Sequence, residues 1–169
     1  MENLNERDWR RLIDAINRGK CILLIGPDVE FLPDGSDDST LSCSLARKLA
    51  ASLPPDSLAV IDDLAHVAQL RYNIDGDRSD IEFEVEEFYR PLADRSLGFH
   101  RGLADLPFTL CVATTAADFM TNAFREAGKS PVSDFYHFRK PRRTELSETN
   151  SQRPIVYHLF GSLGELDSL

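Results

Sequence analysis

The segment CILLIG, residues 21–26, decides the fold class. Five apolar residues in succession, closed by a glycine, are typical of a strand that is buried on both faces, as strands are in a parallel sheet. Three further segments are predicted as strands, over 108–113, 132–138 and 154–160. We therefore expect a sheet of buried strands.

Helices are predicted between and before these strands. Residues 6–18 place Trp9, Leu12, Ile13 and Ile16 on one apolar stripe, which is the pattern of an amphipathic helix. Five more helices are predicted, over 41–53, 57–72, 80–90, 96–104 and 117–127. Strands that alternate with helices predict an α/β fold with a Rossmann-like parallel sheet, and four of the helices form an inserted block between the first two strands.

The whole chain, 1–169, is expected to form a single domain of this kind. The predicted sheet is thin for so many helices, and the sequence ends soon after the last strand. We therefore expect an incomplete domain that is the N-terminal part of a longer multidomain protein.

The composition excludes several classes of function. The chain has 169 residues, 42% of them hydrophobic, and a net charge of −9, so it can bury a core but lacks the basic surface for direct nucleic-acid binding. The same charge argues against binding to an anionic membrane, and no apolar run approaches the roughly 18 residues of a membrane span. Three widely spaced cysteines, Cys21, Cys43 and Cys111, are typical of reduced thiols in a cytoplasmic protein, and no Cys/His cluster predicts a metal site.

The first candidate site is the turn after the first strand, Gly26-Pro27-Asp28. In nucleotide-binding α/β folds this turn holds glycines, which let backbone N–H groups approach a phosphate. Only Gly26 fits that pattern, and Asp28 places a carboxylate where a phosphate would lie. The turn is therefore either a weak phosphate site or a tight turn in a solvated acidic loop.

The second candidate site follows the second strand, at Thr115 and Asp118. Polar groups at the carboxyl end of a parallel strand face the ligand crevice. Thr115 could donate to a ribose or phosphate oxygen, and Asp118 could accept from a ribose hydroxyl. The alternative for Asp118 is to cap the helix over 117–127.

The third candidate site is His158, near the end of the last predicted strand. Histidine titrates near neutral pH and can act as a general base. Strict alternation along the strand places His158 and Phe160 on one face. The alternative is a hydrogen-bonded histidine with a structural role in the sheet.

Taken together and in order, three segments resemble the sirtuin fold, and most closely the sirtuin-like domains of prokaryotic antiviral defence proteins. They are IGPD (25–28), ATTAAD (113–118) and YHLFGS (157–162), and the helical insert between the first two also fits. The resemblance spans essentially the whole chain. It implies that NAD binds across the strand ends through Gly26, Pro27, Asp28, Thr115, Asp118, Gly161 and Ser162.

The resemblance also implies a reaction, in which the nicotinamide–ribose bond is cleaved through a transition state like an oxocarbenium ion, either to deacylate lysine or to deplete NAD. In that family an asparagine positions water and ribose, and a histidine accepts a ribose hydroxyl proton. Here the asparagine position is Ala116 and the histidine position is Phe160, and the glycine-alanine-glycine turn is Gly26-Pro27-Asp28. His158 lies two residues before Phe160, roughly 6–7 Å further back along a strand.

We therefore expect a degenerate sirtuin-like domain of a bacterial antiphage defence or signalling protein, which acts in assembly or partner contact and binds NAD weakly. The alternative is an active NAD hydrolase that depletes NAD on infection, with His158 as its base. Self-association is expected through an unpaired sheet edge at 154–160, with the acidic loop 27–38 meeting the basic stretch 139–143 of a neighbouring copy. The alternative for both loops is that they are merely solvated.

Overall fold

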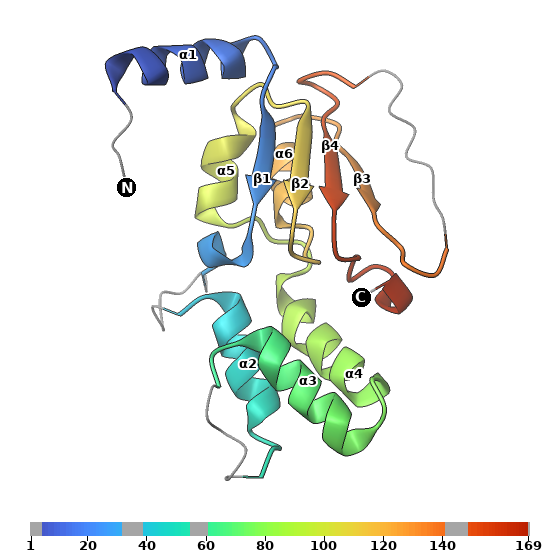
Figure 1. Ribbon diagram of the computed structural model, residues 1–169. Coiled ribbons are helices and arrows are strands. Elements are labelled where there is room, and N and C mark those ends of the chain that lie inside the picture. The colour runs from blue at the N-terminus through green and yellow to red at the C-terminus, as the bar shows by residue number, and fades with distance from the viewer. Residues whose placement is uncertain (1–4, 32–38, 55–60, 141–148, 169) are drawn as a thin grey trace.

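The computed structural model describes residues 5–31, 39–54, 61–140 and 149–168. Its centre is a four-stranded, all-parallel sheet with the strand order β1-β2-β4-β3 (Figure 1). The strands are β1 (Ile22–Ile25), β2 (Leu110–Ala113), β3 (Val132–Phe135) and β4 (Ile155–His158). Each lies within a segment predicted as a strand, and the predicted α/β fold with a Rossmann-like parallel sheet is confirmed.

Strand β4 lies inside the sheet and pairs on both sides. Val156, at its centre, is opposite Cys111 of β2 and Ser133 of β3. The prediction that 154–160 forms an unpaired edge is therefore wrong, because the last strand inserts between β2 and β3 instead of adding outside them. The edges of the sheet are β1 and β3.

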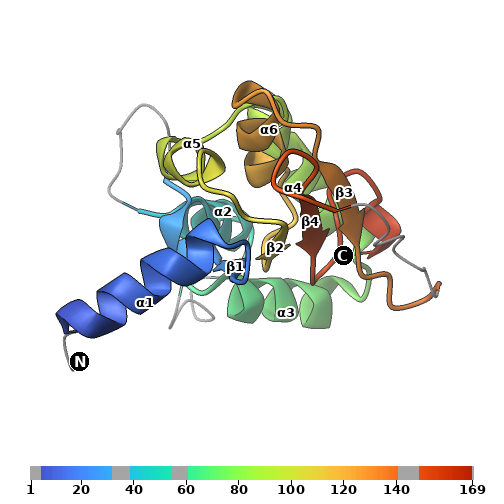
Figure 2. The ribbon, with the colours of Figure 1, turned by 90° about the horizontal axis from the view of Figure 1, so that it is seen from above.

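One face of the sheet is covered by two helices, α5 (Gly98–Ala104) and α6 (Phe119–Glu126), which lie side by side in Figure 2. Side chains from the strands and from these helices share one buried core, which includes Ile25, Cys111, Ala113, Met120, Phe124 and Val156. This core fixes the positions of the strand ends.

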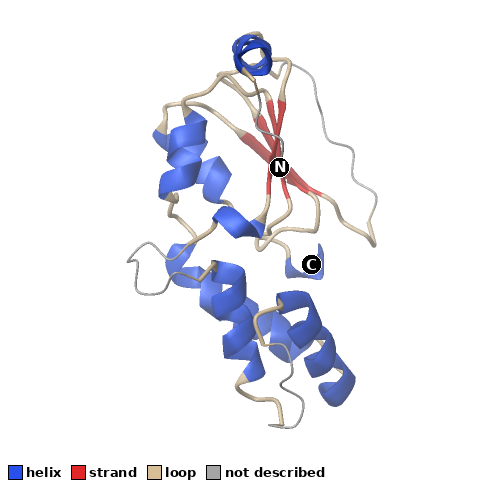
Figure 3. Cartoon of the chain, turned by 60° about the vertical axis from the view of Figure 1, so that its left-hand side comes forward, coloured by secondary structure: helices blue, strands red, loops and turns tan. Residues whose placement is uncertain are grey.

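The opposite face of the sheet is open along β1. The side chains of Ile22 and Leu24 are 64% and 67% exposed, respectively. The prediction that this strand is buried on both faces is therefore wrong: burial alternates along it, and Figure 3 shows no described α-helix over the side of the strands that faces away from α5 and α6.

A helical block lies beyond the carboxyl ends of the strands (Figure 1). It consists of α2 (Leu41–Ala50), α3 (Leu64–Asp75) and α4 (Ser79–Tyr89), and its apolar side chains form a second core. Helix α3 begins after Asp63, whose side chain accepts from the N–H of His66, and not at residue 57 as predicted; residues 55–60 lie outside the described part of the chain. The predicted insert of four helices between β1 and β2 is present, but only α2, α3 and α4 form the block, because the fourth helix, α5, packs on the sheet.

Helix α1 (Glu6–Asn17) stands apart from the helical block and leads directly to β1. Asn5 caps its first turn, and Gly19, with φ of 63°, follows its last turn. None of its residues is buried, and the apolar stripe of Trp9, Leu12 and Ile13 is exposed. Within the described residues, no helix has both the length and the apolar character needed to cross a membrane.

Candidate functional site

A cleft of about 810 Å³ lies between the carboxyl ends of the strands and the helical block. On the sheet side it is lined by Pro27 and Asp28 after β1, Thr115 and Ala116 after β2, and Phe160 after β4. On the helical side it is lined largely by apolar residues, among them Leu45, Leu49, Leu64, Ile81 and Val85. Because α/β folds bind ligands at the carboxyl ends of their strands, this cleft is the candidate site.

Acidic side chains outnumber basic ones along the cleft. Among the described residues, its acidic lining residues are Asp28, Asp62, Asp63 and Glu82, and its one basic lining residue is Arg78. Two of the four carboxylates are paired, since Arg47 Nε lies 2.7 Å from Asp62 Oδ1 and Arg78 Nε lies 3.7 Å from Glu82 Oε1. Asp28 is exposed beside the turn where a phosphate would bind, and its charge repels an anion there.

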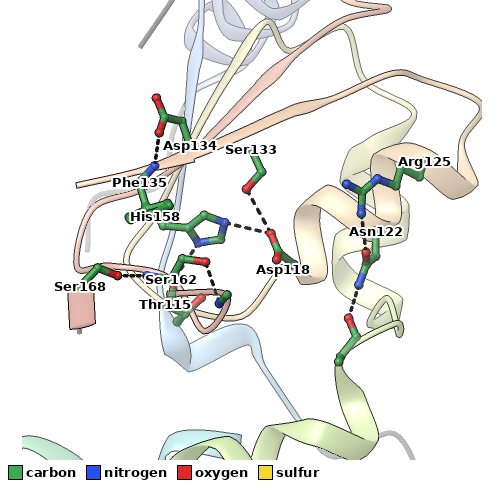
Figure 4. A network of polar contacts seen from close by, with 12 residues as sticks. Thr115, Asp118, Asn122, Arg125, Ser133, Asp134, Phe135, His158, Ser162 and Ser168 are labelled. Carbon is green, nitrogen blue, oxygen red and sulfur yellow. Dashed lines mark hydrogen bonds and ion pairs between the residues drawn. The ribbon is translucent and has the colours of Figure 1, made fainter. Parts of the chain in front are cut away.

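His158 lies next to the cleft's floor but is itself fully buried. Its Nδ1 lies 2.9 Å from the backbone oxygen of Thr115, and its Nε2 lies 3.2 Å from Asp118 Oδ1 (Figure 4). A backbone carbonyl and a carboxylate can only accept hydrogen bonds, so both ring nitrogens carry hydrogen in this arrangement. This arrangement therefore favours the imidazolium form of His158, in which neither ring nitrogen has a free lone pair.

The electrostatics agree with a charged His158. Burial by itself lowers the pKa of His158, but the hydrogen bonds to Asp118 and Thr115, with the charges of Asp118 and Glu30, outweigh burial and raise it. The hydrogen bond from His158 in turn holds the pKa of Asp118 below its ordinary value. The buried His158 and the half-buried Asp118 form an ion pair that links β4 to α6.

Asp118 occupies the N-cap position of α6, but its side chain makes no capping hydrogen bond. Its Oδ1 instead accepts from Ser133 Oγ of β3, at 3.2 Å, as well as from His158. The capping role considered for Asp118 is therefore wrong. Its carboxylate joins three elements, and Asp118 does not line the cleft.

Phe160 and His158 point to different sides of the molecule. Strand β4 ends at His158, and the chain turns at Leu159 and Phe160. As a result Phe160 is 64% exposed and lines the cleft, whereas His158 is buried against Asp118. The prediction that these two side chains share a face is wrong, because regular alternation stops where the strand stops.

Glu30 and His100 form a second buried polar group that the sequence analysis missed. Glu30 follows a short 3₁₀ turn, Pro27–Val29, and is fully buried, although a solvated acidic loop was one of the alternatives for this segment. Thr115 Oγ1 donates to Glu30 Oε1 at 2.7 Å, and His100 Nε2 lies 4.0 Å from the same oxygen. Among the described residues, Glu30 Oε2 and His100 Nδ1 have no hydrogen-bond partner.

Burial controls the charge of both groups. It raises the pKa of Glu30 to about 7, against the opposing effects of the Thr115 hydrogen bond and the charge of His158. It lowers the pKa of His100 to about 4, so that His100 is neutral near pH 7. The only sequence signal for a buried Glu30 is its place between two apolar residues, Val29 and Phe31, in an otherwise acidic loop.

Gly161 and Ser162 lie at a turn that contacts the chain's C-terminal residues, and they do not line the cleft. Gly161 has φ of 93°, and a Cβ at this position would lie 2.4 Å from the backbone oxygen of Ser168. The Ser162 N–H donates to Ser168 Oγ at 2.9 Å. The structure thus brings Pro27, Asp28 and Thr115 to the cleft and places Gly26, Asp118, His158, Gly161 and Ser162 outside its lining.

Together these features define a Rossmann-like parallel α/β domain with a candidate ligand cleft at the ends of its strands. Among the described residues, no three His, Cys, Asp or Glu side chains gather closely enough to hold a metal ion. In comparisons with known proteins, the chain matches no family model and no curated protein.

Proposed function

We propose that the chain is a degenerate sirtuin-like domain of a bacterial antiviral defence or signalling protein, and that it acts in assembly or partner contact without hydrolysing NAD. The three segments that carry the resemblance, 25–28, 113–118 and 157–162, end β1, β2 and β4. These strands are neighbours in the sheet and run parallel, so the three segments lie side by side at the carboxyl ends of the strands. This meeting supports the resemblance, because a dinucleotide site is built from adjacent strand ends.

Our inference that the chain does not hydrolyse NAD rests on the hydrogen bonds and the burial of His158. A general base needs a free lone pair within hydrogen-bond reach of the proton that it takes. Both nitrogens of His158 are engaged with acceptors, and the ring is buried. His158 therefore serves as a positioning residue that ties β4 to α6, and it has no role as a base in the cleft.

The two positions that would carry the chemistry face the cleft without polar groups. Ala116 and Phe160 both line it, in the places where the resemblance implies an asparagine and a histidine. Neither side chain can position water or accept a proton. Loss of one such group typically lowers a rate by about 10²–10⁴-fold, and a second loss leaves little activity.

An active NAD hydrolase is the second candidate, and one observation favours it. Three residues that the resemblance assigns to NAD, Pro27, Asp28 and Thr115, line the same cleft. Glu30 is hydrogen-bonded to Thr115 and has a pKa of about 7, in the range that suits a base. Its carboxyl group is fully buried, however, so the chain would have to rearrange before Glu30 could meet a substrate.

The test is to incubate the protein with NAD and to measure nicotinamide by chromatography. The wild-type chain should release no more nicotinamide than buffer alone. The double variant Ala116→Asn/Phe160→His, which returns two polar groups to the cleft, is the matched comparison. Release by the wild-type chain that disappears in Glu30→Gln would assign the hydrolase instead.

A further inference from the structure

We infer that Glu30 controls which ligand atoms Thr115 can bind in the cleft: Thr115 accepts from ligand donor groups while Glu30 is ionised, and it donates to a ligand oxygen once Glu30 has taken up a proton. A ligand that binds through oxygen acceptors, such as the ribose and phosphate oxygens of a nucleotide, therefore binds together with a proton. This inference rests on the proposed function in one respect, the use of the cleft as a nucleotide site, and it does not depend on whether NAD is hydrolysed.

Thr115 connects a buried carboxyl group to the cleft. It is half-buried and lines the cleft after β2, whereas Glu30 is fully buried. Thr115 Oγ1 donates to Glu30 Oε1 at 2.7 Å, and Glu30 Oε2 has no hydrogen-bond partner among the described residues. Within that part of the chain, the Thr115 hydroxyl is therefore the one hydrogen-bond donor to this carboxyl group.

The single hydrogen of the Thr115 hydroxyl can serve either Glu30 or a ligand, but not both. An ionised carboxylate can only accept, so an ionised Glu30 takes this hydrogen and leaves oxygen lone pairs for a ligand. A protonated Glu30 can donate to Thr115 instead, and the hydrogen of Thr115 is then available to a ligand oxygen. If the ligand took that hydrogen from an ionised Glu30, a buried charge would be left without a hydrogen bond, which is costly.

Three titratable side chains face Glu30 from other elements, namely Tyr89 at the end of α4, His100 of α5 and His158 of β4. Burial lowers the pKa of His100 to about 4, so His100 is neutral near pH 7. Burial and the charge of Glu30 raise the pKa of Tyr89, so its phenol is neutral as well. Of these three, only His158 brings a charge, and that charge favours the ionised form of Glu30.

Ligand binding is linked to proton uptake through the effect of Thr115 on the pKa of Glu30. Burial raises this pKa to about 7, and the hydrogen bond from Thr115 opposes the rise. A ligand oxygen that takes the hydrogen of Thr115 removes the opposing effect, so the pKa of Glu30 is higher in the complex than in the free protein. Between the two pKa values the complex holds a proton that the free protein has lost, and acceptor ligands bind more weakly as the pH rises from 6 to 8.

Thr114 offers a comparison within the same cleft, because its hydroxyl has a partner that does not titrate. Thr114 lines the cleft beside Thr115, and its Oγ1 donates to the backbone oxygen of Ile25 at 3.2 Å. A backbone carbonyl accepts at every pH, so Thr114 presents the same oxygen lone pairs throughout. The dependence on a proton is therefore specific to Thr115.

The test is calorimetric titration with ADP-ribose at pH 7, in buffers that differ in their enthalpy of ionisation, which gives the number of protons taken up per ligand bound. Wild type should take up as much as about half a proton, because Glu30, with a pKa of about 7, is half ionised in the free protein. Binding should also be several-fold weaker at pH 8 than at pH 6. ADP-ribose has no nicotinamide to release, so the result is independent of hydrolysis.

Three variants separate the hydroxyl from a general effect of charge. Thr115→Val removes the hydroxyl but keeps Glu30, and it should lose most of the proton uptake. Glu30→Gln cannot titrate at this position and should lose it too. Thr114→Val is the matched control and should take up as many protons as wild type. No uptake by wild type, equal uptake by Thr115→Val, or no binding of millimolar ADP-ribose would overturn the inference.

A second measurement needs no ligand. NMR of the side-chain carboxyl carbons follows the titration of Glu30, whose signal is assigned by its absence in Glu30→Gln. Thr115→Val should move this titration to higher pH, and Thr114→Val should leave it in place. Titration of Glu30 at the same pH in Thr115→Val and wild type would overturn the inference, whereas nicotinamide release by the wild-type chain would overturn only the proposed function.

Discussion

His158 Nε2 lies 3.2 Å from Asp118 Oδ1, and through this contact the end of β4 is fastened to the start of α6. The histidine is fully buried, while its partner is a half-buried carboxylate that also accepts from Ser133. An ion pair in this setting is worth little compared with apolar packing, but breaking it by removing one partner is costly. We therefore expect loss of the His158–Asp118 pair to lower the stability of the fold.

Replacement of His158 by alanine should destabilise the fold. His158→Ala leaves Asp118 without its main partner and opens a cavity beneath the strand ends, so we expect the free energy of unfolding to fall by about 2–4 kcal/mol. Urea denaturation measures this. Ser133→Ala is the control, because its hydroxyl contacts the same carboxylate from an exposed position and its loss should cost under about 1 kcal/mol. Equal losses in the two variants would contradict the assignment.

Glu30 should make stability depend on pH in a defined window. Its pKa rises from the ordinary 4.5 to about 7 on folding, so between these values the folded chain binds a proton that the unfolded chain has lost. The contribution of Glu30 to stability is therefore present below pH 4.5 and is lost as the pH rises to 7. Relative to wild type, Glu30→Gln should gain stability over this window, by on the order of 3 kcal/mol at most.

The measurement is urea denaturation of wild type and Glu30→Gln at several pH values. The difference between the two proteins reports the titration of Glu30 together with its electrostatic effect on His158. Asp28→Asn serves as the control, since it removes a carboxylate that is exposed instead of buried. A stability difference between wild type and Glu30→Gln that does not vary with pH would show that Glu30 is ionised in the folded state.

Replacement of Gly161 by alanine should lower the stability of the fold more than the same replacement at Gly76, which also has a positive φ. Gly161→Ala combines a positive φ with a Cβ placed 2.4 Å from the Ser168 carbonyl oxygen. Gly76, with φ of 71°, has no atom within 4 Å of a Cβ. We expect Gly76→Ala to cost about 1 kcal/mol of stability and Gly161→Ala clearly more, with displacement of the C-terminal turn. Thermal unfolding compares them, and equal losses would refute the close approach.

Asp28 should weaken the binding of nucleotides in the cleft. Its carboxylate is exposed beside the β1 turn, where a pyrophosphate would lie. Asp28→Asn removes the repulsion without a large change in shape, so ADP-ribose should bind several-fold more tightly at low salt and less so at high salt. Calorimetric titration measures both affinities. Unchanged binding at low salt would place the nucleotide elsewhere or exclude it.

The order of helices and strands is predictable from local patterns. Helix α4 differs from its predicted bounds by one residue at each end, because apolar spacing and caps are properties of the segment itself. The exposure of Ile22 and Leu24 is not predictable in this way. A run of apolar residues looks the same in the sequence whether one face of the strand or both faces are covered. Which faces are covered depends on where helices from distant parts of the chain pack.

The candidate site is predictable only in part. Thr115 comes to the cleft because parallel strands bring their carboxyl ends to one edge. The separation of His158 from Phe160 depends on where strand pairing ends, and the last residues of an element are the hardest to place. Burial of Glu30 depends on contacts with Thr115 and His100, which lie 85 and 70 positions further along the chain, and no local pattern reports such contacts.

The most direct test of the account is a single-turnover measurement of nicotinamide release, with the wild-type chain in excess over labelled NAD. The account predicts no release above buffer, because both ring nitrogens of the buried His158 face acceptors and the cleft offers only Ala116 and Phe160 at the decisive positions. Stoichiometric release that is abolished in a folded His158→Ala protein would contradict it and make His158 the base.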